Sequence, residues 1–168
     1  YGSLPIAHAT GGLIDSINPV IYDDDGSIVL AIFGSGNEDA VLGFAGPDGF
    51  TADLSTIVDG QAFFNCRCLA GNEDCGNVEF TEADLDFTML HEIGHMIGLD
   101  HSQVNRDVVD NSTNCQAEVA DDCAGLPIMY PLSIDPAEQQ NLQRDDEGAL
   151  LALYGGATLS DDFATVTL

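Results

Sequence analysis

The stretch His91-Glu92-Ile93-Gly94-His95-Met96-Ile97-Gly98-Leu99-Asp100-His101 decides the fold, because it reads H-E-x-x-H-x-x-G-x-x-H without a mismatch. Residues four apart lie on one face of a helix, so His91 and His95 can both direct an imidazole at one metal ion. Gly98 falls one turn later, where helices commonly end on a left-handed residue, and the chain can then return His101 as a third ligand. Three protein ligands leave a fourth position open for water, as in a catalytic zinc site.

Glu92 lies about 100° further round the predicted helix, close enough to hydrogen-bond a water on the ion without ligating it. A bound zinc ion lowers the pKa of its water to about 7, and Glu92 is then the general base that takes the proton and passes it to the leaving amine. The alternative is that the histidines only cap or pack a helix. It is disfavoured because three of the four histidines fall within these eleven residues.

Composition predicts one globular domain. The chain has 168 residues, 45% of them hydrophobic, and no apolar run approaches the roughly 20 residues of a membrane span. We expect a catalytic domain over residues 1–156 and a tail or linker over residues 157–168. No signal peptide is recognised, so a soluble, mature or trimmed form is expected.

The charge excludes two classes of partner. There are 29 acidic residues against three arginines and no lysine, which gives a net charge of −26. Nucleic acid and anionic membrane surfaces are bound through lysine and arginine, so neither is expected here. Such acidity is typical of solubility in a salty, calcium-containing medium, where screening shortens the repulsion.

The five cysteines form two clusters in the sequence: Cys66, Cys68 and Cys75, then Cys115 and Cys123. Cys115 and Cys123 can close a short loop, and Cys75 can pair with either member of its cluster. Two disulfides indicate an oxidising compartment, so a secreted, extracellular or periplasmic location is expected, with one thiol left over. A second metal site in the first cluster is the alternative, but it lacks an evident fourth ligand.

Two helices are predicted after residue 80. Thr81 and Asp84 have the spacing of a capping box, so the metal-binding helix should begin at about residue 82 and end at about residue 97. Leu85, Met89 and Ile93 would form its core-facing stripe. A final helix is expected over residues 137–154, ended by Gly155 and Gly156.

The first half of the chain indicates strands. Residues 41–45 read as a strand that Gly46-Pro47-Asp48-Gly49 would stop, residues 51–60 as a connection, and residues 61–66 as a second strand. Residues 28–33 are ambiguous between strand and helix. Asp23, Asp24 and Asp25 form an acidic turn that is either a solvated loop or a calcium site, and the solvated loop is favoured.

The sequence resembles a metzincin metalloprotease, and within that clan the matrixins, the matrix metalloproteinase-like group. The resemblance extends over about residues 81–155 and has three parts. His91–His101 is followed by Ser102, where matrixins usually carry Ser or Thr. Pro127-Ile128-Met129-Tyr130-Pro131 is similar to the Met-turn, and its tyrosine directly after the methionine favours matrixins. Residues 142–148 and Leu153-Tyr154-Gly155 are similar to the family's C-terminal helix with its paired aspartates.

The resemblance implies an α+β zincin fold: a twisted, mixed five-stranded sheet, an active-site helix and a C-terminal helix. Either Val41–Ala45 or Gln61–Asn65 would be the edge strand that binds an extended peptide, and the region Val41–Pro47 is preferred. Met129 would form an apolar floor under the zinc histidines. Tyr130 would stand near the cleft, and Pro131 and Leu132 would wall the pocket for the residue after the scissile bond.

The sequence also departs from the family. His8 is the only spare histidine, so the structural zinc usual in matrixins is not expected. The segment 102–128 with its cysteines is atypical of the vertebrate enzymes and suggests a bacterial relative. No propeptide motif with a zinc-blocking cysteine is present; the odd cysteine is interpreted as an unpaired or intermolecular thiol.

These observations predict a secreted zinc endopeptidase acting on extracellular proteins, with Zn²⁺ as catalytic cofactor and Ca²⁺ as a candidate structural ion. Its expected partners are protein or peptide substrates and a pro-segment or inhibitor, and the chain is expected to be monomeric. The alternatives are a serralysin- or astacin-like metzincin and a catalytically silent zinc-binding interaction domain.

Overall fold

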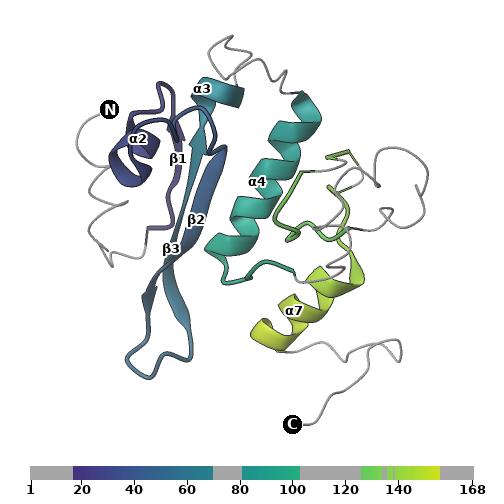
Figure 1. The fold of residues 1–168 in the computed structure, drawn as a ribbon. Coiled ribbons are helices and arrows are strands. Elements are labelled where there is room, and N and C mark those ends of the chain that lie inside the picture. The colour runs from purple at the N-terminus through teal and green to yellow at the C-terminus, as the bar shows by residue number, and fades with distance from the viewer. Residues whose placement is uncertain (1–16, 70–80, 103–125, 134–135, 138, 156–168) are drawn as a thin grey trace. The chain divides into compact units, whose positions relative to one another are not determined.

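A computed structural model describes residues 17–69, 81–102, 126–133, 136–137 and 139–155 (Figure 1). The chain separates into two compact units, residues 1–98 and 99–168, and each is described by itself. The predicted boundary at residue 156 stays a prediction, since the tail lies outside the described residues. The elements in chain order are β1 (Val20–Asp23), α2 (Ser27–Phe33), β2 (Gly43–Phe50), β3 (Ile57–Asn65), α3 (Cys66–Leu69), α4 (Glu82–Met96) and α7 (Arg144–Tyr154).

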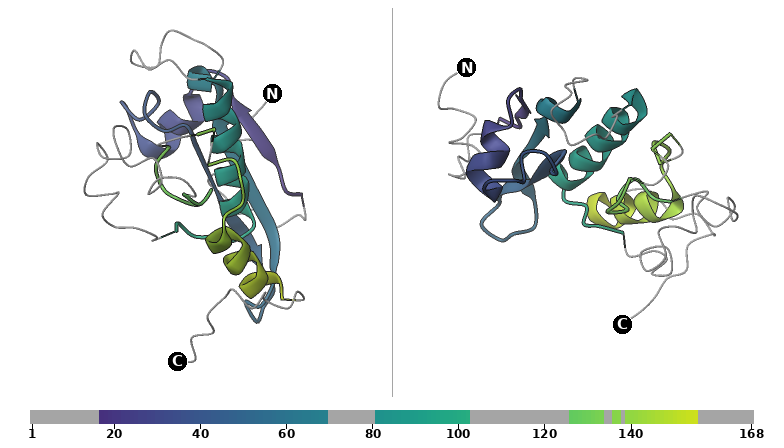
Figure 2. Two further views of the ribbon diagram at one scale, coloured as in Figure 1. Left: turned by 90° about the vertical axis from the view of Figure 1, so that its right-hand side faces the viewer. Right: turned by 45° about the horizontal axis from the view of Figure 1, so that its top comes forward.

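The sheet of the first unit is mixed. Its strand order is β1-β3-β2, with β1 parallel to β3 and β2 antiparallel to β3. Figures 1 and 2 show α4 running beside this sheet. The predicted α+β class with a mixed sheet is confirmed. Three strands belong to the described residues, so the count of five strands stays a prediction.

The strand bounds differ from the predicted ones. β2 begins at Gly43, two residues later than predicted, and β3 runs from Ile57 to Asn65, so part of the predicted connection 51–60 is strand. β2 continues from Gly43 to Phe50 through Pro47, with register shifts between Pro47 and Gly49 and between Gly49 and Phe50. Proline is tolerated because β2 has a single neighbour among the described strands, and its missing N–H removes no ladder bond on an open edge. β3 lies between β1 and β2, so Gln61–Asn65 is not the edge strand and that alternative was wrong.

The two faces of the β2–β3 pair carry different side chains, as the alternation of a strand requires. On one face Phe44 stacks on Phe63, with ring centroids 4.5 Å apart, and meets Phe33 of α2 edge-on at 5.1 Å. On the other face Gly43 lies against the side chain of Glu92, and Gly60 lies against the backbone of Met96, both from α4. The aromatic face therefore packs on α2, while the glycines let α4 come close to the sheet.

The ambiguous segment 28–33 belongs to helix α2. Asp23, the last residue of β1, is buried, and its Oδ2 accepts hydrogen bonds from the amides of Ile28 and Val29 at 2.9 and 3.0 Å. A carboxylate at the first turn satisfies amide groups that the helix itself leaves unpaired. The acidic turn thus starts a helix.

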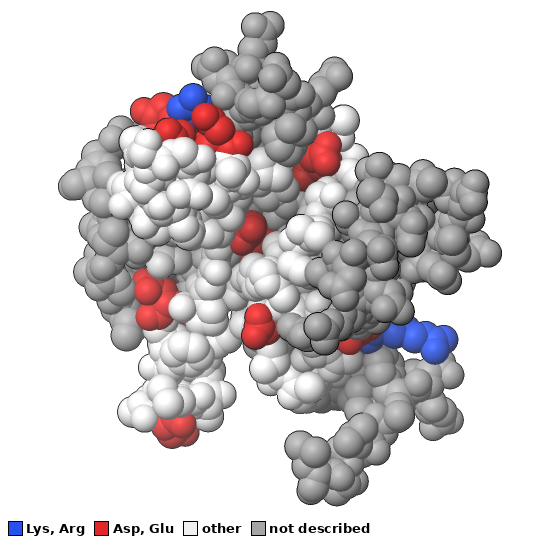
Figure 3. Space-filling model, viewed as in Figure 1, with Lys and Arg blue, Asp and Glu red and all other residues white. Residues whose placement is uncertain are grey.

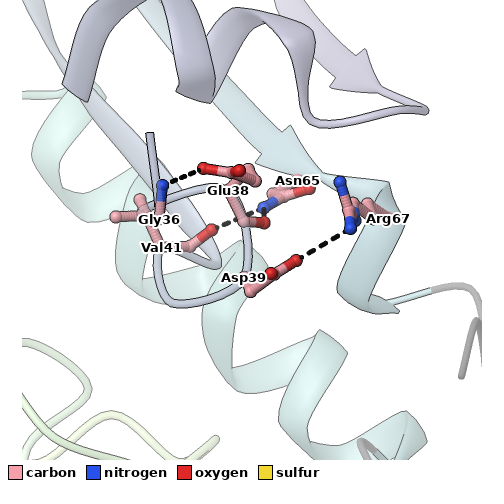
Figure 4. Close-up of polar contacts among 6 residues, drawn as sticks. All are labelled: Gly36, Glu38, Asp39, Val41, Asn65 and Arg67. Carbon is pink, nitrogen blue, oxygen red and sulfur yellow. Dashed lines mark hydrogen bonds and ion pairs between the residues drawn. The ribbon is translucent and has the colours of Figure 1, made fainter. Parts of the chain in front are cut away.

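The start of β2 is fixed by Asn65 (Figure 4). This side chain is fully buried, and its Nδ2 donates to the carbonyl oxygens of Glu38 and Val41 at 2.7 and 2.8 Å. The amide of Asn65 donates to the carbonyl of Leu42 at 2.9 Å. Nearby, Arg67 pairs with Asp39 at 3.1 Å. The chain that leads into Gly43 is therefore held by both the backbone and a buried amide side chain.

Helix α4 begins as predicted. Thr81 and Asp84 form the capping box, with the Thr81 hydroxyl accepting from the Asp84 amide at 3.3 Å and the Asp84 carboxylate accepting from the Thr81 amide at 2.9 Å. The predicted apolar stripe was wrong at Ile93, which is exposed, while Leu85 and Met89 are half-buried. The buried residues of the helix are Phe87, Thr88, His91, Glu92 and Gly94. The buried face of α4 therefore carries His91 and Glu92.

Helix α7 is shorter than predicted. It begins at Arg144, with Gln143 in an extended conformation as its N-cap, so residues 137–143 are not helical where they are described. The Asp146 carboxylate accepts a hydrogen bond from the Gln143 amide at 2.9 Å, which closes a capping box at this point. The predicted end is confirmed, since Gly155 follows Tyr154 with a positive φ of 32°.

Acidic side chains are spread over the face of the molecule that Figure 3 shows. Cys66 is a free thiol, which removes one of the two pairings considered for Cys75. Cys75, Cys115, Cys123 and His8 lie outside the described residues, as does the Cys68 side chain. No helix in the described ranges is both long enough and apolar enough to cross a membrane.

Candidate metal centre

His91 and His95 project from consecutive turns of α4 and converge. Their Nε2 atoms are 3.2 Å apart, and their rings meet edge to face with centroids 4.7 Å apart. Two imidazoles bound to one tetrahedral zinc at about 2.0–2.1 Å would place their nitrogens about 3.3 Å apart. The observed separation therefore suits a shared ion. His91 is buried and also packs on the ring of Phe87, which orients it.

His101 reaches the same place after the helix ends. Gly98 has a φ of 94°, and its amide donates to the carbonyl of His95 at 2.9 Å, so the predicted left-handed turn is present. The Asp100 carboxylate accepts from the His101 amide at 2.7 Å and holds the next turn. One ligand atom from each histidine lies within 4.8 Å of the other two.

This donor set fits zinc. Three imidazole nitrogens suit a borderline-soft divalent ion, and three protein ligands leave a coordination position for water or substrate. Within the described ranges no other set of three His, Cys, Asp or Glu side chains gathers its ligand atoms in this way. Asp23, Asp24 and Asp25 do not, because Asp23 turns its carboxylate toward the start of α2.

Glu92 lies beside the histidines in a poorly solvated place. Its side chain is buried, and its Oε2 has no hydrogen-bond partner among the described residues. Burial raises the pKa of Glu92 to about 7, since the low-dielectric surroundings disfavour the charged form. A carboxyl group with this pKa can accept a proton and return it near neutral pH.

Gly43 is a site residue that sequence reasoning missed. A Cβ added to it would lie 2.8 Å from Cγ and 3.2 Å from Cδ of Glu92. The signal was present in the sequence: a lone glycine between Leu42 and Phe44 in a strand often marks a close approach of another group. Its partner could not be predicted, because that depends on how α4 lies on the sheet.

The predicted Met-turn is a hydrogen-bonded turn in the second unit. The amide of Tyr130 donates to the carbonyl of Pro127 at 3.0 Å. The buried Asp146 accepts from the amides of Ile128 and Met129 at 3.0 and 3.1 Å. One carboxylate of α7 thus fixes the turn that presents Met129.

Ser102, which follows His101, is hydrogen-bonded to the Met-turn. Its amide donates to the carbonyl of Met129 at 2.8 Å, and its hydroxyl donates to the carboxylate of Asp145. The paired aspartates of α7 therefore have separate tasks: Asp146 holds the turn, and Asp145 holds the segment that follows His101.

The predicted pocket residues differ in exposure. Tyr130 is almost fully buried, and its hydroxyl has no hydrogen-bond partner among the described residues. Burial raises the pKa of this hydroxyl, so it stays protonated and can donate. Pro131 and Leu132 are exposed, and the carbonyl of Leu132 accepts from the buried Gln139 side chain at 3.0 Å. Their role in a substrate pocket stays a prediction.

The sequence matches a known protein family. A family model described as Matrixin matches residues 20–130, a range that contains β1, the three histidines and Met129 of the Met-turn. The chain belongs to the matrixin family. The predicted matrixin group is thereby confirmed, and a serralysin- or astacin-like protein is not supported.

This matrixin is also similar to a plant protein. Metalloendoproteinase 1 of Glycine max is 31% identical to it over 130 residues, which cover 76% of this chain and 36% of that protein. The matrixin chain thus spans about a third of the length of this relative. No solved structure matches the chain significantly.

Proposed function

We propose that the chain is a zinc-dependent endopeptidase that hydrolyses peptide bonds of extracellular proteins. The observation that carries the proposal is the convergence of three histidine nitrogens within 4.8 Å beside the buried Glu92, whose Oε2 has no hydrogen-bond partner among the described residues. Membership of the matrixin family and the likeness to a protein named metalloendoproteinase support the same activity.

The histidines and Glu92 have distinct roles in this proposal. His91, His95 and His101 would hold the ion. When bound, zinc would act as a Lewis acid that polarises the peptide carbonyl, and it would lower the pKa of a coordinated water to about 7. Glu92 accepts a proton at Oε2 from the attacking water and then donates it to the amine that leaves. In the zinc-free site, burial raises the pKa of Glu92 to about 7.

The substrate would bind as an additional strand. β2 has one neighbour among the described strands, and an extended peptide would pair with the N–H and C=O groups on its other edge. The stretch from Gly43 to Gly46 is the part suited to this, because Pro47 lacks an amide hydrogen. This part of β2 begins at the glycine that contacts Glu92, so a peptide paired there would lie near the general base.

The remaining assignments extend the proposal. Met129 would form the apolar floor under the histidines, and Tyr130, Pro131 and Leu132 would line the pocket after the scissile bond. We propose a secreted, monomeric enzyme, from a bacterial source, that is regulated by a pro-segment or inhibitor. Calcium at Asp23–Asp25 stays a prediction from the sequence, and zinc is the ion that the activity requires.

A catalytically silent zinc-binding domain is the competing function. Glu92 argues against it, because a buried carboxyl oxygen that has no hydrogen-bond partner in the described part of the chain destabilises the fold and serves no binding purpose. The test is cleavage of an unfolded protein by the zinc-loaded chain, with loss on chelation and recovery on adding zinc. Zinc binding without any cleavage would favour the silent domain.

A further inference from the structure

We propose that Gly43 is a positioning residue for Glu92: the missing side chain at the first residue of β2 leaves the space that the catalytic carboxyl group occupies. This inference rests on the proposed function and names a part of the site outside the histidine motif. Both residues belong to the first compact unit, so the contact lies within one body.

The contact is too close to accommodate a methyl group. A Cβ on Gly43 would lie 2.8 Å from Cγ and 3.2 Å from Cδ of Glu92, and 3.1 Å from the carbonyl oxygen of Phe63. Carbon atoms in contact normally stay about 3.5–4.0 Å apart. The backbone of β3 closes one side of the space, so the side chain of Glu92 has to move if a methyl group is added.

The strand cannot easily move instead. Gly43 pairs with Phe64 of β3, and the residue before it is held through its carbonyl by the amide of Asn65 at 2.9 Å. The buried side chain of Asn65 fixes the carbonyl of Val41 as well, at 2.8 Å. Glu92 therefore has to give way, and no hydrogen bond to Oε2 among the described residues holds it in place.

β2 itself supplies a matched control. A Cβ on Gly46 would meet nothing within 4 Å, and neither Gly43 nor Gly46 has a positive φ. Alanine is therefore compatible with the backbone at both positions. The two substitutions add the same methyl group to one strand, and only the substitution at Gly43 reaches Glu92.

The contact between Gly43 and Glu92 can be tested by urea denaturation, which needs no activity assay. In zinc-free protein, Gly43→Ala should lower the urea midpoint when residue 92 is Glu, and should lower it much less in the Glu92→Ala background, where Cγ and Cδ are absent. Gly46→Ala should leave the midpoint unchanged in both backgrounds. An equal loss from Gly43→Ala in both backgrounds would overturn the proposed contact.

The effect of this contact on catalysis by Glu92 can be tested by measuring turnover. With zinc loaded, Gly43→Ala should lower kcat at least tenfold while KM and zinc content stay as in the wild type. An unchanged kcat in Gly43→Ala would refute the positioning role even if the contact is real. Absence of proteolysis by the wild type would refute the proposed function, and the urea midpoints would still decide the contact.

Discussion

At the scale of the residue, Glu92 combines burial with a carboxyl oxygen that has no hydrogen-bond partner among the described residues. Desolvation disfavours its charged form and raises its pKa from 4.5 to about 7. Between these pH values the folded protein binds a proton at Glu92 that the unfolded chain has released. Ionisation of this group therefore opposes folding, and it does so fully above the folded-state pKa.

Glu92→Gln should remove this pH dependence. In zinc-free protein the variant should gain stability over the wild type as the pH rises from 4 to 8, by about 3 kcal/mol for a shift of this size. Urea denaturation of both proteins at several pH values measures the difference, because titrating groups that do not interact with Glu92 contribute equally in both proteins. A difference that stays constant with pH would show that Glu92 is not desolvated in the folded state.

At the scale of the element, the close approach of α4 to the sheet depends on small residues of β2 and β3. Gly60 of β3 lies under the end of α4, where an added Cβ would be 2.6 Å from the carbonyl oxygen of Met96. A backbone atom in a helix cannot step aside as a flexible side chain can. Helix and strand would have to separate, which disturbs the packing of both.

Gly60→Ala should therefore lower the free energy of unfolding by about 1–3 kcal/mol, as is usual for overpacked cores. Gly46→Ala on the neighbouring strand meets nothing within 4 Å and serves as the control. Urea denaturation of the two variants checks the expectation. Equal stabilities would mean that α4 does not lie close to β3 at Gly60.

Asp146 joins α7 to the Met-turn by accepting backbone hydrogen bonds from Ile128, Met129 and Gln143. Asp146→Ala leaves these amide groups without the carboxylate and should lower the free energy of unfolding by about 3 kcal/mol. Glu147→Ala, on an exposed neighbour in the same turn, should change it by less than about 0.5 kcal/mol. Comparable losses in the two variants would contradict the role of Asp146.

Features that depend on neighbouring residues in the chain were predictable from the sequence. The capping box at Thr81, the turn at Gly98 and the end of α7 at Gly155 each follow from local backbone chemistry. The convergence of His91 and His95 follows from helix geometry alone, with no knowledge of the rest of the fold.

Features that depend on distant partners were not predictable. α7 begins at Arg144 because Asp146 is engaged both by its own cap and by the Met-turn, 17 and 18 residues away in the chain. β2 continues past Pro47 because its outer edge has no partner among the described strands. The contact between Gly43 and Glu92 requires the register of β2 and the placement of α4 together.

At the scale of the whole molecule, the net charge of −26 acts against the compact state. The Debye length falls from about 30 Å at 0.01 M salt to about 3 Å at 1 M, so salt should screen this repulsion. The urea midpoint should therefore rise between 0.01 M and 1 M sodium chloride, and potassium chloride should give the same rise. A midpoint that falls or stays constant would show that the repulsion is compensated within the folded chain.

The central claim is that three histidines hold a zinc ion while Glu92 moves the proton. The most direct measurement is zinc content and turnover of an unfolded-protein substrate, determined on the same samples of wild type and Glu92→Gln. We expect one zinc per chain in both proteins and at least about 100-fold lower turnover in the variant, because glutamine accepts no proton. Equal turnover in the two zinc-loaded proteins would contradict the account.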